Sequence, residues 1–157
     1  INVGASYSTI TLVHAGLPLF TRDVAIGGND YTEAIQQRLG VPFDGAEAYK
    51  VGGTNAGVAD VVPQEVHRIL AEMSDRVAGE FQRTLDFFAG QRPDVQLARV
   101  FLTGGTALIP QLPKAIMDRT RVPAHILDPF ARSKVDARRF DTAYLKATAP
   151  MAALAFG

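Results

Sequence analysis

The sequence predicts an α/β fold in which a mixed β-sheet is packed against helices. Three observations predict it: an opening rich in β-branched residues with a tight turn, one long amphipathic helix near the middle, and a strand–helix–strand–helix order at the end. Antiparallel strands followed by crossover units are typical of a mixed sheet with helices on its faces. The 157 residues suit one domain, or two small subdomains that share a core.

The opening of the chain predicts a β-hairpin. Ile10 and Leu12 alternate with threonines, and the surrounding residues are dense in β-branched side chains. The short "HAG" stretch at 14–16 is a turn, so residues 7–13 and 17–26 are expected to pair.

Two short helices follow the hairpin. Two glycines end its second arm, and Asn29 or Asp30 is expected to cap a helix that Gly40 stops. The "DGAEAYK" stretch predicts a second helix, because Asp44 and Glu47 have the spacing of a capping box.

The middle of the chain predicts a long helix from about residue 63 to residue 89. Apolar residues recur there in steps of three and four, which predicts one continuous buried stripe. The members of this stripe are Val66, Ile69, Leu70, Met73, Val77, Phe81, Leu85 and Phe88.

The last third predicts strand, helix, strand and helix. The "LARVFLTGG" stretch is expected to be a buried strand, and a helix over 110–120 is expected to point Leu112 and Ile116 inward. The "AHILDPF" stretch predicts a short strand with a turn at Asp128, and Thr148 is expected to cap a closing helix, "APMAALAF".

Composition excludes several classes of protein. Sixteen basic residues balance sixteen acidic ones, so no global field favours nucleic acid. The absence of cysteine excludes disulfides and thiolate metal sites. His14, His67 and His125 have no metal-ligand spacing, so no metal site is expected. The first residue is not methionine, and we expect the sequence to be a fragment of a longer protein.

Two glycine turns, in "NVGAS" and "LTGG", each follow a predicted strand. Ligands of such sheets collect beyond the carboxyl ends of strands, where free backbone N–H groups can bind phosphate. The first turn could therefore cradle phosphates and the second could lie against a flat nucleoside. Either turn alone could equally be a tight turn with no ligand.

Several stretches together resemble a known family. They are "NVGAS", "GLPLFTRDVAIGGNDYTEAIQQRLG", "AEAYK", "FLTGGTALIPQL" and "LDPF". In this order they resemble the second half of the actin-like ATPase (ribonuclease H-like) superfold, and most closely the PilM family of type IV pilus assembly. The resemblance implies a sheet subdomain of residues 1–40 and 93–157, with an inserted helical subdomain of residues 41–92.

The same resemblance implies a nucleotide site. Its second phosphate-binding hairpin corresponds to Asn2, Gly4, Ala5 and Ser6; its adenosine turn corresponds to Gly104, Gly105, Thr106 and Leu108; and its ribose and base contacts correspond to Glu47 and Lys50. The expected cofactor is ATP with magnesium. Asn2 stands where the family usually has aspartate, so we expect weak hydrolysis at most in a longer protein, and no activity from this chain alone. No catalytic residue is assigned.

The family further implies a cytoplasmic scaffold, recruited to the cytoplasmic face of the inner membrane, in which ATP acts as a conformational ligand. The expected partner is the N-terminal tail of PilN, which docks mainly on the other half of the fold. Other inner-membrane pilus assembly proteins and a second copy of the protein are further expected partners. The alternatives are an FtsA-like filament protein and an active ATPase or kinase of the same superfold.

Alternative interpretations of two groups of residues remain open. Glu47 and Lys50 could be a solvated helix pair worth about 0.2–0.5 kcal/mol. The basic residues of the C-terminal stretch could be solvated surface or a docking face for an acidic partner; they are Arg132, Lys134, Arg138, Arg139 and Lys146.

Overall fold

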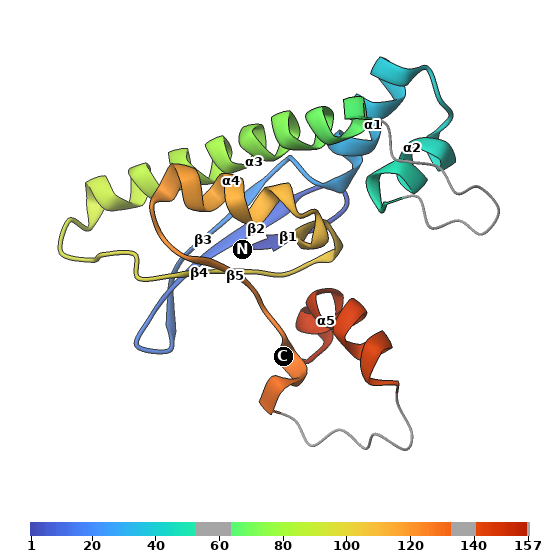
Figure 1. Ribbon diagram of the computed structural model, residues 1–157. Helices are drawn as coiled ribbons and strands as arrows, with labels where there is room; N and C mark the ends of the chain where they lie inside the picture. Colours follow the sequence, from blue (N-terminus) through green and yellow to red (C-terminus); the bar gives the residue numbers. More distant parts are fainter. Residues whose placement is uncertain (53–63, 133–140, 157) are drawn as a thin grey trace.

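The computed structural model describes residues 1–52, 64–132 and 141–156 (Figure 1). Most of the glycine-rich "VGGTNAGVAD" stretch lies outside the described residues, as do the basic residues Lys134, Arg138 and Arg139. Within the described part of the chain, no helix has the length and apolar character needed to span a membrane.

Among the described residues, five strands form the sheet. Strands β1 (Asn2–Val3), β2 (Ser8–His14) and β3 (Leu17–Val24) pair antiparallel in that order, and β4 (Val100–Leu102) pairs parallel with β5 (Ala124–Ile126). A parallel bridge between Asn2 and Thr103 joins the two groups. The order across the sheet is therefore β3-β2-β1-β4-β5, and the predicted mixed sheet is confirmed.

The helices cover this sheet unequally. Helix α1 spans Gly28–Leu39, α2 Phe43–Lys50, α3 Gln64–Gln91, α4 Gln111–Thr120 and α5 Thr142–Phe156, and the 3-10 helices η1 and η2 span Gly105–Leu108 and Pro129–Arg132. Figure 1 shows α3 and α4 side by side along the sheet, with α1 and α2 near the N-terminal end of α3. Helix α5 lies below the sheet in this view and contacts η1 and η2.

The core lies between the sheet and helices α1, α3 and α4. The predicted stripe of α3 is buried as far as Phe81, and Leu112 and Ile116 of α4 point inward as predicted. One polar pair is buried with them: the hydroxyls of Tyr31 on α1 and Ser74 on α3 are 3.1 Å apart. The core holds residues of both predicted subdomains, and the boundaries between those subdomains stay a prediction.

Three predicted helix caps are wrong. Helix α1 begins at Gly28, and Asp30 sits in its first turn, where the carboxylate accepts the Gly27 N–H at 2.8 Å. Helix α2 begins after Pro42, so Asp44 is already inside it and makes no cap. Helix α5 begins before Thr148, whose hydroxyl donates to the carbonyl of Tyr144 at 2.9 Å. In each case the helix starts earlier than the polar residue suggested.

Two burial predictions also fail. The strand predicted over "LARVFLTGG" is only three residues long, and Phe101 in its middle is 42% exposed. His14 shares the strand parity of Ile10 and Leu12, which predicts a partly buried side chain, but the side chain is exposed. His14 is the last residue of β2, next to the turn at Ala15 and Gly16, where the hairpin extends into solvent.

Candidate functional site

The two predicted glycine bends leave the sheet at the same edge. The Val3 N–H donates to the carbonyl of Thr103 at 2.8 Å, and the Thr103 N–H donates to the carbonyl of Ile1 at 2.9 Å. Strand β1 therefore lies directly beside the end of β4. The bends that follow these two strands, residues 4–6 and 104–106, consequently face one another.

Gly104 brings the two bends into backbone contact. Its φ is +87°, and a Cβ built on it would lie 2.3 Å from the Val3 carbonyl oxygen. No side chain fits at that distance, and L-residues disfavour that φ. The Gly104 N–H donates to the carbonyl of Pro150 on α5 at 2.8 Å, so the turn is also tied to the C-terminal helix.

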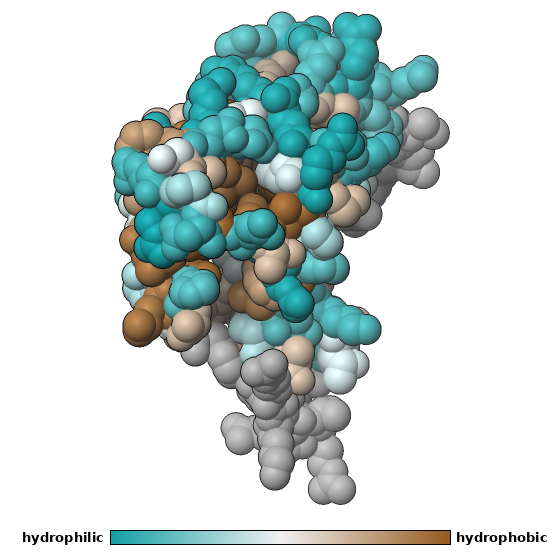
Figure 2. Space-filling model, turned by 90° about the vertical axis from the view of Figure 1, so that its left-hand side faces the viewer, coloured by the Kyte–Doolittle hydropathy of each residue, from teal (hydrophilic) through white to brown (hydrophobic). Residues whose placement is uncertain are grey.

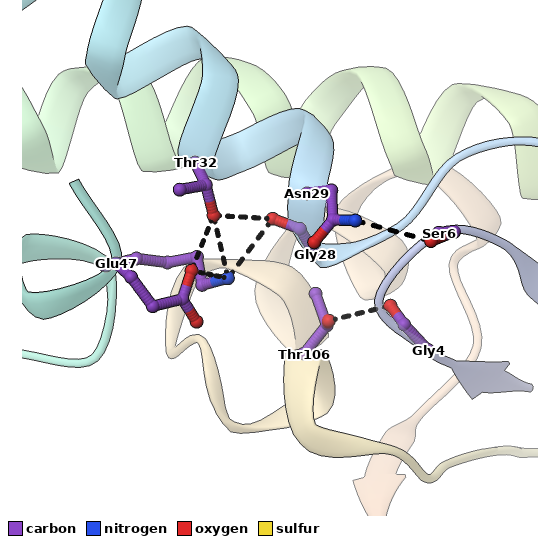
Figure 3. Close-up of polar contacts among 8 residues, drawn as sticks. Gly4, Ser6, Gly28, Asn29, Thr32, Glu47 and Thr106 are labelled. Atoms are coloured by element: carbon purple, nitrogen blue, oxygen red, sulfur yellow. Dashed lines mark hydrogen bonds and ion pairs between the residues drawn. The ribbon is translucent and has the colours of Figure 1, made fainter. Parts of the chain in front are cut away.

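A third segment, the start of α1, closes on the first bend. The Gly4 carbonyl accepts hydrogen bonds from the Gly28 N–H at 2.9 Å and from the Thr106 hydroxyl at 3.0 Å (Figure 3). The Ala5 carbonyl accepts the Asn29 N–H at 2.7 Å. A Cβ on Gly27 would lie 2.5 Å from that same Ala5 oxygen, so the chain here also packs backbone against backbone.

Glu47 and Lys50 of α2 reach this junction from the side. The Lys50 ammonium donates to the Gly28 carbonyl at 3.2 Å and to the Thr32 hydroxyl at 2.9 Å, and it lies 2.7 Å from the Glu47 carboxylate. The Thr32 hydroxyl is 2.7 Å from that carboxylate and 3.2 Å from the Gly28 carbonyl. Figure 3 shows these groups converging between α1 and α2.

The charges of this network balance. The Thr32 hydroxyl has one proton, and the shorter distance favours its donation to Glu47, which leaves the Gly28 carbonyl to Lys50. Burial raises the pKa of Glu47, but the hydrogen bonds from Lys50 and Thr32 outweigh it and leave that pKa below its ordinary value. The Lys50 side chain is only 12% exposed. The Glu47 side chain is 40% exposed, so the pair is partly solvated, but its bonds to Gly28 and Thr32 also tie α2 to α1.

The other predicted residues surround this junction. Asn2 lies under the bend, and its side-chain oxygen accepts the Thr103 hydroxyl at 3.1 Å. Ser6 is exposed, and its hydroxyl accepts the Asn29 amide at 3.3 Å. A Cβ on Gly105 would meet only the flexible side chain of Met151, at 3.6 Å. Leu108 is exposed at the end of η1.

The first bend offers main-chain N–H donors of the kind that hold an anion. Ala5 and Ser6 are exposed, and among the described residues no hydrogen bond of their main-chain amides is found. Free, adjacent amides of this kind can hold an anion. The amides of Gly4 and Gly104 are already used, by the carbonyls of Tyr7 and Pro150. The described residues include no group of three or more acidic or histidine side chains that could hold a metal ion.

The sequence prediction missed four residues that build this junction: Gly27, Gly28, Asn29 and Thr32. The strand pattern of the sequence predicts the paired glycines only as the end of the hairpin. Their side-by-side placement before a polar residue was the available signal, since it marks a turn with close backbone approach. No local signal pointed to Thr32, which acts only through its contacts with α2.

Comparison with known proteins relates this geometry to a family. The sequence profile of the family described as "Type IV pilus assembly protein PilM" matches residues 1–157. Among solved structures, a chain of a PilM–PilN type IV pilus biogenesis complex matches with a TM-score of 0.82 and 24% identity. The match covers 98% of this chain and 42% of that one, so the chain spans less than half of the relative's length.

Two other solved structures share the fold at lower similarity. The ethanolamine utilization protein EutJ from Carboxydothermus hydrogenoformans matches with a TM-score of 0.64 and 17% identity, over 80% of this chain and 42% of that one. MreB 5 of Spiroplasma citri, solved bound to AMPPNP, matches with a TM-score of 0.57 and 15% identity, over 80% of this chain and 46% of that one. These likenesses show the actin-like ATPase fold.

Proposed function

Because the chain belongs to the type IV pilus assembly protein PilM family, we propose that it is one half of a cytoplasmic, actin-like nucleotide-binding scaffold of the pilus assembly machine. In this proposal the chain is part of a longer protein, and ATP binds in a cleft between the two halves. The partner is a PilN-like N-terminal tail, and the scaffold is recruited with it to the cytoplasmic face of the inner membrane.

One observation carries the proposal: two bends that are about one hundred residues apart in sequence lie against each other. The Gly4 carbonyl and the Thr106 hydroxyl are 3.0 Å apart, and Gly104 lies against the Val3 carbonyl. The first bend presents exposed amides, which suit phosphate oxygens. The second bend has no side chain at Gly105, and only the flexible Met151 side chain lies within 4 Å of a Cβ added there, so a shift of that side chain would make room for a flat nucleoside. Lys50 lies close to both bends through Gly28.

ATP would act as a conformational ligand. A nucleotide held by two halves binds most tightly when the halves are closed on it, so its binding free energy favours the closed arrangement. Partner affinity then follows the population of that arrangement, by an amount equal to the coupling free energy. When magnesium is bound it supplies charge neutralisation to the phosphates. Asn2, a neutral amide, would add a ligand oxygen but no charge.

Calorimetric titration of ATP with magnesium tests this proposal. We expect micromolar or tighter binding by the longer protein and no measurable heat from residues 1–157 alone. In the longer protein, Gly105→Val should lower the affinity at least about tenfold, a loss of about 1.4 kcal/mol, because the branched side chain would pack against Met151 and occupy the face of the turn that a nucleoside would contact.

Gly90→Val provides the matched control. The same substitution is made there at an exposed position of α3 with no heavy atom within 4 Å of the added Cβ, far from the two bends. It should leave nucleotide affinity unchanged. Equal affinities for the Gly105→Val variant and the parent would contradict the assignment of the second bend, and no heat from any form would contradict nucleotide binding altogether.

A further inference from the structure

Strand β3 forms a free edge of the sheet. It stands at one end of the strand order, and within the described part of the chain β2 is its one pairing partner. Six of its eight side chains are exposed, and Phe20 and Val24 are half-buried. A free edge presents unpaired main-chain groups, to which a further strand can add.

The end of this edge is also apolar. Figure 2 views the end of the molecule that the β2–β3 hairpin and the C-terminal part of α3 form, and it shows brown, hydrophobic side chains gathered there. The exposed hydrophobic residues of these elements include Val13, Leu17 and Phe87. An exposed apolar cluster beside a free strand edge is typical of a surface that contacts another chain.

The hydrogen-bond pattern fixes which residues of β3 point outward. The Val3 N–H donates toward the β4 side, so Val3 and Ser8 exchange no bonds between β1 and β2. Bonded and non-bonded pairs alternate along antiparallel strands. Ser8 therefore bonds toward β3, where it lies opposite Val24. Counting back from Val24, the main-chain groups of Thr21 and Asp23 point outward.

On the α3 face of this edge, a cation lies next to aromatic rings. The Arg22 guanidinium is 3.5 Å from the Thr84 hydroxyl, and no ion pair of Arg22 is found among the described residues. Phe20 lies on the same face, and its ring centroid is 6.3 Å from that of Phe87. Phe87 is 55% exposed, so its ring can accept a further contact.

We propose that a second copy of the protein adds to this edge, with the two β3 strands antiparallel about a two-fold axis through Thr21. The two Thr21 residues then exchange both main-chain hydrogen bonds. Arg22 lies opposite the partner subunit's Phe20, with its guanidinium against that ring and the adjoining ring of the partner subunit's Phe87. The proposal goes beyond the nucleotide-binding scaffold and does not depend on it.

Charge and strand shape exclude the neighbouring registers. Cross-strand partners share a face of the sheet, so the axis passes through a residue. An axis through Arg22 or Asp23 would place two like charges directly opposite each other, which is destabilising. An axis through Leu19 or Phe20 would fall where the pairing of β2 with β3 shifts register, and such a shift bends the strand. Thr21 is the neutral residue between these two obstacles.

Sedimentation velocity at increasing concentration tests the association. Residues 18–24 of each copy can pair, and Pro18 ends the ladder because it has no N–H. Such an interface is smaller than the standard size, so we expect a dissociation constant of about 10–1,000 μM, both for residues 1–157 and for the longer protein. A monomer at every concentration up to about 1 mM in either form would overturn the proposal.

A matched pair of lysine variants locates the interface. Thr21→Lys places two like charges opposite each other and should weaken the dimer at least about tenfold. Thr11→Lys is the control, because Thr11 is exposed and lies opposite Thr21 on β2, one strand in from the edge. It should leave the dissociation constant unchanged. Equal effects of the two variants would overturn the assignment to the β3 edge.

Oxidative cross-linking of residues 1–157 tests the register. The chain has no cysteine, so a single introduced thiol reports one position. Thr21→Cys should give a disulfide-linked dimer, because opposite residues of a bonded pair have Cα atoms about 5.5 Å apart. Asp23→Cys should not, because its two thiols would lie about 13 Å apart along the strands. Cross-linking that is equal for the two variants, or favours Asp23→Cys, would overturn the proposal.

These measurements are independent of the nucleotide. All are made without ATP, so a failure of nucleotide binding leaves them intact. A failure of the dimer likewise leaves the calorimetric titration intact.

Discussion

At the scale of single residues, main-chain atoms hold the candidate site together. Gly104 and Gly27 each lie directly against a carbonyl oxygen. A Cβ added to Gly104 would be 2.3 Å from the Val3 oxygen, and one added to Gly27 would be 2.5 Å from the Ala5 oxygen. Between these contacts, the carbonyls of Gly4 and Ala5 accept N–H groups from the start of α1. The side chains of Lys50 and Thr106 then bond to main-chain carbonyls already in place.

Gly104→Ala should destabilise the fold strongly. With φ of +87° and ψ of 161°, Gly104 lies in a backbone region essentially restricted to glycine, which costs another residue about 1–3 kcal/mol, and the clash with the Val3 carbonyl adds to this. Gly40→Ala has a milder strain of about 1–2 kcal/mol, because φ of +65° and ψ of 27° are left-handed helical and no heavy atom lies within 4 Å of the added Cβ. Thermal unfolding should therefore show a clearly larger loss for Gly104→Ala. Equal losses would mean that the close approach to Val3 is not maintained in solution.

The terminal amine should make the stability of residues 1–157 depend on pH. Its pKa is about 6 when folded and 8.0 ordinarily, so between these values only the unfolded chain takes up the proton. The free energy of unfolding should therefore fall by about 1–2 kcal/mol as the pH drops from 8 to 6, since Ile1 is only half-buried.

An N-terminally acetylated chain is the control for this pH effect. Acetylation keeps an N–H donor for Phe101 but removes the titration, and every other titrating group is common to both forms. Urea unfolding at several pH values should give a difference between the two forms that grows below pH 8. A constant difference would contradict the burial of the amine.

At the scale of elements, the buried face of α3 supplies more of the core than any other described helix or strand. Phe81 is fully buried, so Phe81→Ala should lower the free energy of unfolding by about 3–5 kcal/mol. Phe87 is 55% exposed and contacts mainly the ring of Phe20, with ring centroids 6.3 Å apart, so Phe87→Ala should cost about 1 kcal/mol or less. Urea denaturation of both variants measures this difference, and similar losses would contradict the burial pattern of α3.

Element positions could be predicted from the sequence where the signal was repeated along the chain. The stripe of α3 extends over several turns, so one irregular residue did not mislead the prediction, and the hairpin turn was equally plain. The caps depended on single residues. Asp30 and Asp44 were expected to begin helices, but a polar residue in the first turn can equally bond backward or face solvent. Asp30 bonds back to the Gly27 N–H, and Asp44 lies exposed in the first turn of α2.

The site could be predicted only in part. Gly104 and Gly105 stood out because a glycine pair directly after an apolar run marks a turn. The contact of Gly4 with Gly28 and Thr106 could not be inferred from spacing, because it depends on how three distant segments meet. The burial of the Lys50 side chain could likewise not be predicted, because the sequence shows its charge but not the main-chain carbonyl that accepts its hydrogen bond.

At the scale of the whole molecule, nucleotide and partner should be coupled. In the longer protein, a fluorescent peptide of the PilN N-terminal tail should bind with an affinity that changes about 5- to 150-fold when saturating ATP and magnesium are added. Linkage requires that the peptide change nucleotide affinity by the same factor. Fluorescence anisotropy measures the first quantity and calorimetry the second.

The Gly105→Val variant serves as the control for this coupling. It should bind the peptide as the parent does without nucleotide, and its affinity should not respond to ATP. Residues 1–157 alone should not bind the peptide, because the tail is expected to dock mainly on the other half. Peptide binding by residues 1–157, or an affinity indifferent to ATP in the parent protein, would contradict the proposed scaffold.

The bond from the Gly104 N–H to the Pro150 carbonyl has a consequence for how this protein can change by mutation. Every residue has a main-chain carbonyl, so no substitution at position 150 deletes the acceptor. On the side of α5, the tether is therefore vulnerable only to shifts of the helix backbone. Deletion or insertion of one residue between 141 and 149 rotates the helix by about 100° and would sever it.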